Sequence, residues 1–252
     1  MKRFLLFILT LFFMPEVSNG YPNGTPFYVT DIGPFCASCH AQSKIDYTPD
    51  LPPEFSIREI PGNKHYAFIK SVPSPYAELT MEQKEAIIKE AKFIDANSSI
   101  SISAPSRVKA GEIIKVKVIV KGGNGPVIGI ALVDRPLRNQ ARPIQAEGWI
   151  IIEEPEIKDQ DGKVQRSWLN KRINGLKRNI NYVMIMDQKY DKEKNLFPSG
   201  EITYTLKAPD KPGIHSLTAA LFYGTENTEK AGFFQRPSGR ILFSDEMKIN
   251  VE

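Results

Sequence analysis

Residues 114–121 read Ile-Lys-Val-Lys-Val-Ile-Val-Lys, and the fold class can be inferred from this pattern. The apolar residues Ile114, Val116, Val118 and Val120 alternate with lysines at most of the intervening positions. Side chains of a β-strand point alternately to the two faces of a sheet. A period of two therefore predicts a strand with one face buried and the other face in water.

Turn and strand signals continue on the C-terminal side of this segment. Gly122-Gly123-Asn124-Gly125 predicts a turn, and Pro209-Asp210-Lys211-Pro212-Gly213 predicts another. Further strands are expected over Val127–Val133, Trp149–Ile152, Tyr182–Met186, Ile202–Leu206, His215–Tyr223 and Ile241–Val251. Many short strands between Gly/Pro turns predict a mainly β chain. Residues 98–252 are expected to form an antiparallel β-sandwich of immunoglobulin-like type.

Residues 21–97 differ in composition from this β-rich part. They are rich in proline and poor in strand patterns, which predicts a small, mostly irregular and partly α-helical region. One helix is expected over Met81–Ala96, because Thr80 and Gln83 form a capping-box pattern and no Gly or Pro follows. The helix should have one apolar stripe and solvated lysines: Ile87, Ala91 and Ile94 on the stripe, and Lys84, Lys89 and Lys92 in water.

Residues 1–20 have the features of an export signal. Lys2 and Arg3 form a basic start, Phe4 to Met14 is almost purely apolar, and small residues precede a cleavage point after Gly20. The apolar run is much shorter than the about 20 residues that a membrane-spanning helix needs. We therefore expect a periplasmic or extracellular protein without stable membrane insertion after cleavage. Export and the mild net charge of +4 make nucleic-acid binding implausible.

The only two cysteines of the chain lie in one run, Cys36-Ala37-Ser38-Cys39-His40. This spacing is typical of a c-type haem attachment site. Residues three and four apart share one helix face, so both thiols can be tethered to the haem while His40 binds the iron as its proximal ligand. A shorter helix is expected to carry this run. A thiol-disulfide oxidoreductase, a zinc site and a structural disulfide are the alternative interpretations.

With this motif after an export signal, the chain resembles bacterial exported monohaem c-type cytochromes. It is also similar to exported bacterial proteins in which a short haem motif precedes a β-sandwich. The resemblance implies one covalent haem c on Cys36 and Cys39, and electron transfer with unidentified redox partner proteins. The chain departs from the class I cytochrome c pattern before the motif, where prolines and glycines replace the expected helix. A haem-carrying binding or assembly module without electron-transfer activity is a further alternative.

The distal side of the iron has two candidate ligands. His65 lies in the irregular region and is the favoured one, and Met81 at the start of the closing helix is the alternative. His215 is expected at the edge of the sandwich core. No pattern typical of a catalytic triad, phosphate loop or metalloprotease helix occurs in the sequence, so we expect an electron carrier rather than an enzyme.

Two charged groups of residues remain as candidate docking or cofactor contacts. An acidic stretch from Glu153 to Asp161 is followed by a basic one from Lys163 to Arg178. Solvated loops are the favoured interpretation, and a docking patch for an acidic redox partner is the functional one. A loop cluster of Arg135, Arg138 and Arg142 is expected to be ordinary surface arginines, with pairing to haem propionates as the functional alternative.

Overall fold

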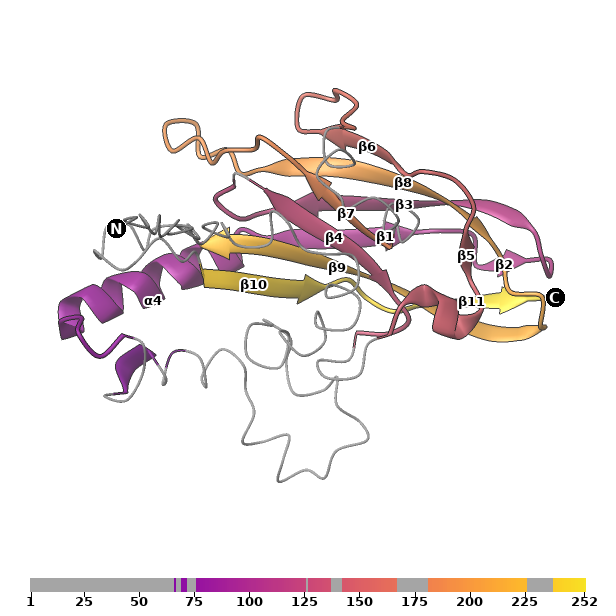
Figure 1. Cartoon of the computed structure of the whole chain (residues 1–252), viewed down its shortest axis with the longest axis horizontal. Coiled ribbons are helices and arrows are strands. Elements are labelled where there is room, and N and C mark those ends of the chain that lie inside the picture. The colour runs from indigo at the N-terminus through magenta and orange to yellow at the C-terminus, as the bar shows by residue number, and fades with distance from the viewer. Residues whose placement is uncertain are drawn as a thin grey trace, which may run out of the picture.

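The computed structural model describes residues 66, 69–71, 76–125, 127–136, 142–166, 181–225 and 238–252. Within these residues the chain forms one long helix and two β-sheets of five and six strands (Figure 1). The elements in chain order are α4 (Met81–Ala96), β1 (Ser99–Ser103), β2 (Arg107–Val108), β3 (Ile113–Lys121), β4 (Ile128–Val133), η2 (Ile144–Glu147), β5 (Ile150–Ile151), β6 (Glu156–Asp159), β7 (Tyr182–Ile185), β8 (Ser199–Lys207), β9 (Gly213–Thr225), β10 (Ser238–Phe243) and β11 (Met247–Val251).

The strand order is that of an immunoglobulin-like sandwich. One sheet runs β1-β3-β8, with β5 and β6 beside β8, and the other runs β2-β11-β9-β4-β7, with β10 beside β9. All pairs are antiparallel except β2 with β11, which is parallel. These orders match the A-B-E-D and G-F-C arrangements of immunoglobulin domains. The predicted mainly β fold with an immunoglobulin-like sandwich is confirmed.

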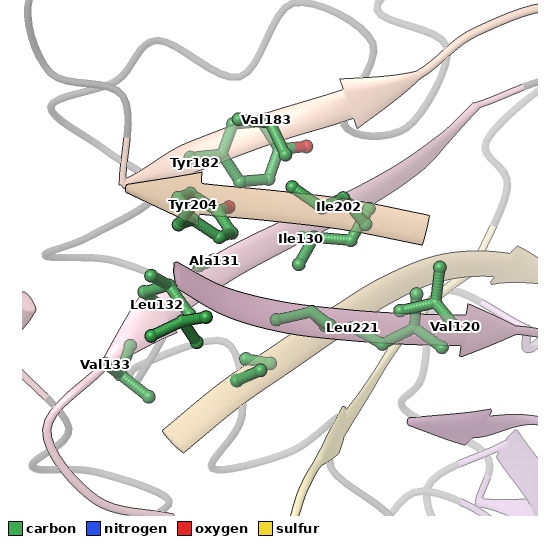
Figure 2. Packing of buried hydrophobic residues seen from close by; sticks show 14 of the residues in the cluster. Val120, Ile130, Ala131, Leu132, Val133, Tyr182, Val183, Ile202, Tyr204 and Leu221 are labelled. Carbon is green, nitrogen blue, oxygen red and sulfur yellow. The ribbon is translucent and has the colours of Figure 1, made fainter. Parts of the chain in front are cut away.

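The apolar residues that alternate with polar ones in residues 114–121 form part of the inner face of the first sheet. Along β3 the side chains are exposed and buried in strict turn, with Ile114, Val116, Val118 and Val120 all inside. Val120 lies near Ile130 and Leu221 of the opposite sheet in the core (Figure 2). Every residue of β4 and β7 is buried. The uninterrupted apolar sequence of these two strands follows from this burial on both faces.

The last predicted strand, Ile241–Val251, is divided in the structure. Its two parts, β10 and β11, both pair with β9, but Ser244–Glu246 between them leave the ladder. The buried Ser244 occupies this break: its amide donates to the Ala219 carbonyl at 2.8 Å, and its Oγ accepts from the Ala219 amide at 3.0 Å. The hydroxyl thus replaces a backbone partner, which lets the strand bend without leaving a buried amide unpaired.

Other predicted strands differ from the structure by a few residues at their ends. The predicted strand Trp149–Ile152 is reduced to Ile150–Ile151, and the predicted Ile202–Leu206 and His215–Tyr223 extend to β8 and β9. The strands β1, β2 and β6 were not predicted from the sequence. The helix Met81–Ala96 has the predicted bounds, and its capping box between Thr80 and Gln83 is formed in both directions.

Helix α4 packs against the sandwich at one end of β9 and β10, away from the C-terminus (Figure 1). Ile94 is fully buried in the sandwich core, whereas Ile87 and Ile88 form a second cluster with Ile69. Tyr66, Tyr76 and Leu79 pack around this second cluster. The helix therefore joins the segment that precedes it to the sandwich.

Candidate functional site

Most of the predicted haem-binding residues, both the attachment cysteines and the iron ligands, lie outside the described residues. These are Cys36, Cys39, His40 and His65, so the attachment motif and the favoured distal ligand stay predictions. Met81, the alternative distal ligand, is the first residue of α4, and its side chain is 54% exposed. No three His, Cys, Asp or Glu side chains in the described part of the chain come together as a metal site.

The nearest described residue to His65 is Tyr66, and it belongs to a polar cluster beneath α4. Its hydroxyl lies 3.2 Å from Oδ2 of Asp95, near the C-terminal end of the helix, and donates a hydrogen bond to it. The hydroxyl of Tyr223 on β9 donates to the other oxygen, Oδ1, at 2.8 Å. Arg240 on β10 donates through Nε to Oδ1 at 3.0 Å and through Nη2 to Oδ2. We call Tyr66, Asp95, Tyr223 and Arg240 the Asp95 cluster.

The ion pair at the centre of this cluster is removed from water. The Arg240 side chain is 1% exposed and that of Asp95 is 13% exposed. A carboxylate near the C-terminal end of a helix opposes the helix dipole, and the last turn of α4 contains no basic residue to offset it. The position of Asp95 is therefore accounted for by its partners on β9 and β10 and not by the helix itself.

Two of the partners of Asp95, Arg240 and Tyr66, have shifted pKa values. Burial lowers the pKa of Arg240, but the hydrogen bond and the charge of Asp95 outweigh it, and the net pKa is raised. Burial, together with the neighbouring Asp95 carboxylate, raises the pKa of Tyr66 to about 12, although the Arg240 charge opposes the shift. Tyr66 is therefore a neutral donor and Arg240 a cation throughout the physiological pH range.

The ring of Tyr66 is held as well as its hydroxyl. The Lys92 ammonium lies 5.2 Å from the ring centroid, and the Arg240 guanidinium carbon lies 5.8 Å from it. The ring also packs against the cluster of Ile69, Ile87 and Ile88. Cations over the face of an aromatic ring attract it, so these contacts support the orientation that the hydrogen bond sets.

Two cationic residues at this end of the molecule are buried. Lys84 was expected in water, but it is only 5% exposed. The prediction was wrong because Lys84 shares the helix face of Ile87 and Ile88. The other residue is Arg240, whose Nη1 is buried without a hydrogen-bond partner in the described part of the chain. This guanidinium donor is suited to bind a carboxylate or another polar acceptor.

A second contact fixes α4 to the sandwich through aromatic rings. Phe93 lies 6.2 Å from Tyr190 and 5.7 Å from Phe197 between ring centroids. Tyr190 and Phe197 stack at 4.3 Å, and the Lys121 ammonium lies 5.7 Å from the Phe197 ring. Together with the Asp95 cluster, these rings hold the C-terminal half of α4 from two sides.

The described arginines of the predicted propionate cluster already have carboxylate partners. Arg142 donates through Nε to Asp134 Oδ2 at 2.8 Å and lies 3.4 Å from Glu147. Arg135 lies 3.5 Å from Asp134 and 3.9 Å from Glu147. Asp134 is fully buried and also accepts the amides of both arginines. These side chains therefore have a structural role in the loop after β4, and Arg138 lies outside the described residues.

Three carboxylates in the described part of the predicted docking patch have cationic partners. Glu153 binds Lys115 at 2.7 Å, Glu154 binds Arg166 at 3.0 Å, and Glu156 binds Lys158 at 2.8 Å. These partners lower the pKa of Glu153 and Glu156. Exposed pairs of this kind are typical of a solvated surface. The basic residues from 167 to 178 lie outside the described part.

His215 lies at the core edge, as predicted, with its ring between two backbone carbonyls. Nδ1 is 2.8 Å from the Glu147 oxygen, and Nε2 is 2.9 Å from the Lys211 oxygen. The ring thus connects η2 to the turn before β9, and this position accounts for it as a structural residue.

Sequence reasoning missed the Asp95 cluster. Its ion pair joins residues 145 positions apart, and no periodicity relates them. One signal was available: Asp95 follows Ile94 in the last turn of a helix, where an acidic residue is unfavourable. That signal marks Asp95 as a residue with a partner but does not identify Arg240.

None of the described helices is both long and apolar enough to cross a membrane.

Comparisons with known proteins give neither a family nor a function. No protein-family model and no curated protein matches the chain. Among solved structures, the CARDB domain of PF1109 from Pyrococcus furiosus, in complex with di-metal ions, is 9% identical with a TM-score of 0.27, covering 62% of this chain and 90% of that one. The C-terminal domain of the Streptococcus agalactiae AgI/II polypeptide BspA is 8% identical with a TM-score of 0.31, covering 61% and 50%.

A third similar structure is the C-terminal domain of the Streptococcus pyogenes antigen I/II-family protein AspA. It is 9% identical with a TM-score of 0.29, covering 61% of this chain and 46% of that one. The chain thus spans about half the length of the two streptococcal chains that it matches. At these TM-scores the likeness carries no argument about the site.

Proposed function

We propose that this protein is an exported monohaem c-type cytochrome whose function is electron transfer. The single observation that carries the proposal is the run Cys36-Ala37-Ser38-Cys39-His40, which contains both cysteines of the chain. The apolar segment with a basic start in residues 1–20 supports export to a periplasmic or extracellular location. The haem would be attached in that compartment.

The residues of the motif have separate tasks in this proposal. Each thiol of Cys36 and Cys39 adds across a vinyl group: a sulfur–carbon bond forms, and the thiol proton passes to the other vinyl carbon, so no oxidant is consumed. His40 would bind the iron through a neutral ring nitrogen, and His65 would be the second iron ligand. When bound, the haem supplies one-electron redox chemistry.

The residues present fit such a group. Haem carries two propionate carboxylates, and Nη1 of Arg240 is a buried donor without a hydrogen-bond partner among the described residues. A buried donor without a partner is unfavourable, so Nη1 requires a polar or anionic acceptor. Arg240 is paired with Asp95 of α4, at the end of the sandwich that follows the proposed haem-binding region.

The described fold supports haem attachment over thiol chemistry. A thioredoxin-like oxidoreductase places its two cysteines in a unit of alternating strands and helices. In this chain the described residues after the motif form one helix and an immunoglobulin-like sandwich. A periplasmic thiol-disulfide oxidoreductase that uses Cys36 and Cys39 remains the alternative function.

The proposal is tested by producing the full chain in a bacterial host that attaches c-type haem. The exported protein should carry a haem that survives denaturing electrophoresis and adds the mass of one haem to the chain. The variant Cys36→Ser/Cys39→Ser should carry none, and Ser38→Ala should be loaded as the wild type is. Wild-type protein without covalent haem would overturn the proposal, and disulfide-exchange activity in that material would support the alternative.

Electron transfer needs a separate measurement on the loaded protein. The iron should be reduced by a strong small donor such as dithionite and reoxidised by ferricyanide, reversibly and without loss of haem. A haem that cannot be cycled in this way would indicate a haem-carrying binding or assembly module instead.

A further inference from the structure

The first sheet ends at a strand that lacks the usual protection against pairing with another chain. Among the described strands β1 pairs with β3 alone, so its second side forms an edge of the sheet. Natural edge strands avoid further pairing through charged side chains, proline, bulges or a very short length. Residues 99–103 read Ser-Ile-Ser-Ile-Ser and contain no charge and no proline. Their pairing with β3 is regular over the whole strand, without a bulge.

Other edge strands in the described part of the two sheets have such protection. β2 and β5 are only two residues long. β6 contains Glu156 and Lys158, which form an ion pair at 2.8 Å. β10 contains the buried charge of Arg240, and every residue of β7 is buried. The absence of protection therefore distinguishes β1 from these edges.

The inward side chains of β1 are only partly covered. The serines of this strand are exposed, whereas Ile100 and Ile102 are partly buried against the sandwich core. On the neighbouring β3 the inward residues are at most 5% exposed. A further strand beside β1 would cover apolar surface that Ile100 and Ile102 still expose, and this burial would favour its binding.

We propose that β1 is a self-association site that binds a second copy of this chain. The sequence Ser-Ile-Ser-Ile-Ser reads the same in both directions, so two copies can pair antiparallel about a two-fold axis at Ser101. Ile100 then lies opposite Ile102 of the second copy, and Ser99 lies opposite Ser103 of the second copy. Isoleucines stay on the core side of the extended sheet and serines on the solvent side. This symmetry favours a second copy over an unrelated extended peptide, which would not require it.

The association should be weak and reversible. A ladder of this length buries much less than the about 1,200–2,000 Å² of a stable protein interface. The structure therefore predicts a monomer–dimer equilibrium that depends on protein concentration. Because few residues take part, a change in one row of the ladder should alter the dimerisation constant measurably. This inference does not depend on the haem.

One row of the ladder provides a matched set of variants. Position 99 of each copy lies opposite position 103 of the other, and the two-fold axis produces this pair twice. Ser99→Lys/Ser103→Glu creates two pairs of opposite charge, and Ser99→Lys/Ser103→Lys creates two pairs of like charge. Ser99→Glu/Ser103→Lys repeats the opposite-charge pairing with the charges exchanged. It controls for the neighbours on β3, which are Lys121 beside Ser99 and Lys117 beside Ser103.

The measurement is sedimentation velocity of the full chain over concentrations from micromolar to millimolar. The wild type should form dimers as the concentration rises. Each opposite-charge variant should dimerise about fivefold more tightly than the wild type, and the like-charge variant at least about fivefold more weakly. Urea unfolding followed by the fluorescence of the buried Trp149 shows whether each variant is folded.

A wild type that remains monomeric at every concentration would overturn the proposal. Equal dimerisation of the opposite-charge and like-charge variants would also overturn it, because the association would then use another surface. If the like-charge variant does not fold, the two opposite-charge variants decide the question: tighter dimerisation of both supports the proposed pairing, and no gain in either contradicts it.

Discussion

The Asp95→Asn variant should lose a large part of the stability of the fold. The substitution keeps the size and one oxygen of the side chain but removes the charge opposite Arg240. Arg240 is 1% exposed, so its charge cannot be solvated once the carboxylate is gone. Removing one partner of a buried ion pair costs about 3–5 kcal/mol. Because Asp95 is 13% exposed and Asn still accepts one hydrogen bond, we expect a value near the lower limit, about 3 kcal/mol.

The assay is urea unfolding of the full chain, followed by tryptophan fluorescence. Trp149 is fully buried, and its ring nitrogen donates to the Ser216 carbonyl at 3.2 Å, so its emission reports on the sandwich. The midpoint should fall while the slope stays constant, because the surface exposed on unfolding does not change. In thermal unfolding, the same loss corresponds to a fall of roughly 6–12 °C for a chain of this size.

Two comparisons make the result decisive. The control Glu85→Gln makes the same change of a carboxylate to an amide on the same helix. Lys70 lies 3.8 Å from Glu85, and both side chains are exposed. This variant should lower the free energy of unfolding by less than about 0.5 kcal/mol. Asp95→Asn/Arg240→Met removes both buried charges and should recover much of the loss. A cost of Asp95→Asn no greater than that of Glu85→Gln would refute the buried ion pair.

Three further predictions follow from other contacts. Gly125→Ala should lower the free energy of unfolding, measured in thermal unfolding, by about 2 kcal/mol or more, because φ is +80° and the new Cβ would clash with the Gln188 carbonyl oxygen. Gly162→Ala is the control: φ is +76° but nothing lies within 4 Å of the new Cβ, so the loss should be only about 1 kcal/mol. Ser244→Ala should lose about 1 kcal/mol in urea unfolding, and a neutral result would contradict its role in the strand break. The pKa of Tyr66 is raised to about 12 in the folded chain. The neutral Tyr66 hydroxyl should therefore contribute its full stabilisation below pH 10, and this contribution should be lost as the pH rises to 12. The difference in unfolding free energy between wild type and Tyr66→Phe should therefore shrink over that range by on the order of 1 kcal/mol, the value being reduced because Tyr66 is only half-buried.

Secondary structure could be predicted where one face of a strand is exposed to solvent, or where a local sequence pattern marks the start of an element. In β3 each buried residue is followed by an exposed one, so the strand and its inner face could be inferred from the period alone. The capping box of Thr80 and Gln83 set the start of α4 because both hydrogen bonds are local. By contrast, β1 was not predicted, although Ile100 and Ile102 alternate with serines over its five residues. Among the described strands it pairs with β3, at the edge of the sheet.

The haem motif can be recognised from the sequence and stays a prediction, whereas the contacts of the Asp95 cluster could not be predicted. The spacing of Cys36, Cys39 and His40 indicates haem attachment because the reacting groups are neighbours in sequence. Arg240 and Asp95 come together only when β9 and β10 pack beneath α4, and no local pattern carries that information. The burial of Lys84 likewise could not be predicted from the local sequence. A lysine on a helix is solvated in most contexts, and its burial depends on what the rest of the chain brings to that helix face.

The length of β9 separates the two ends of the sandwich by a known distance. Gly213 at its start pairs with Val251 of β11, and Tyr223 near its end binds Asp95. Ten residues of strand at about 3.3 Å each span about 33 Å. The sandwich thus separates the end of β11 from helix α4 by about this distance. A fluorescent protein or an immobilising tag fused beyond β11 would be held at this distance, and the opposite end would stay accessible to an electrode or a partner protein.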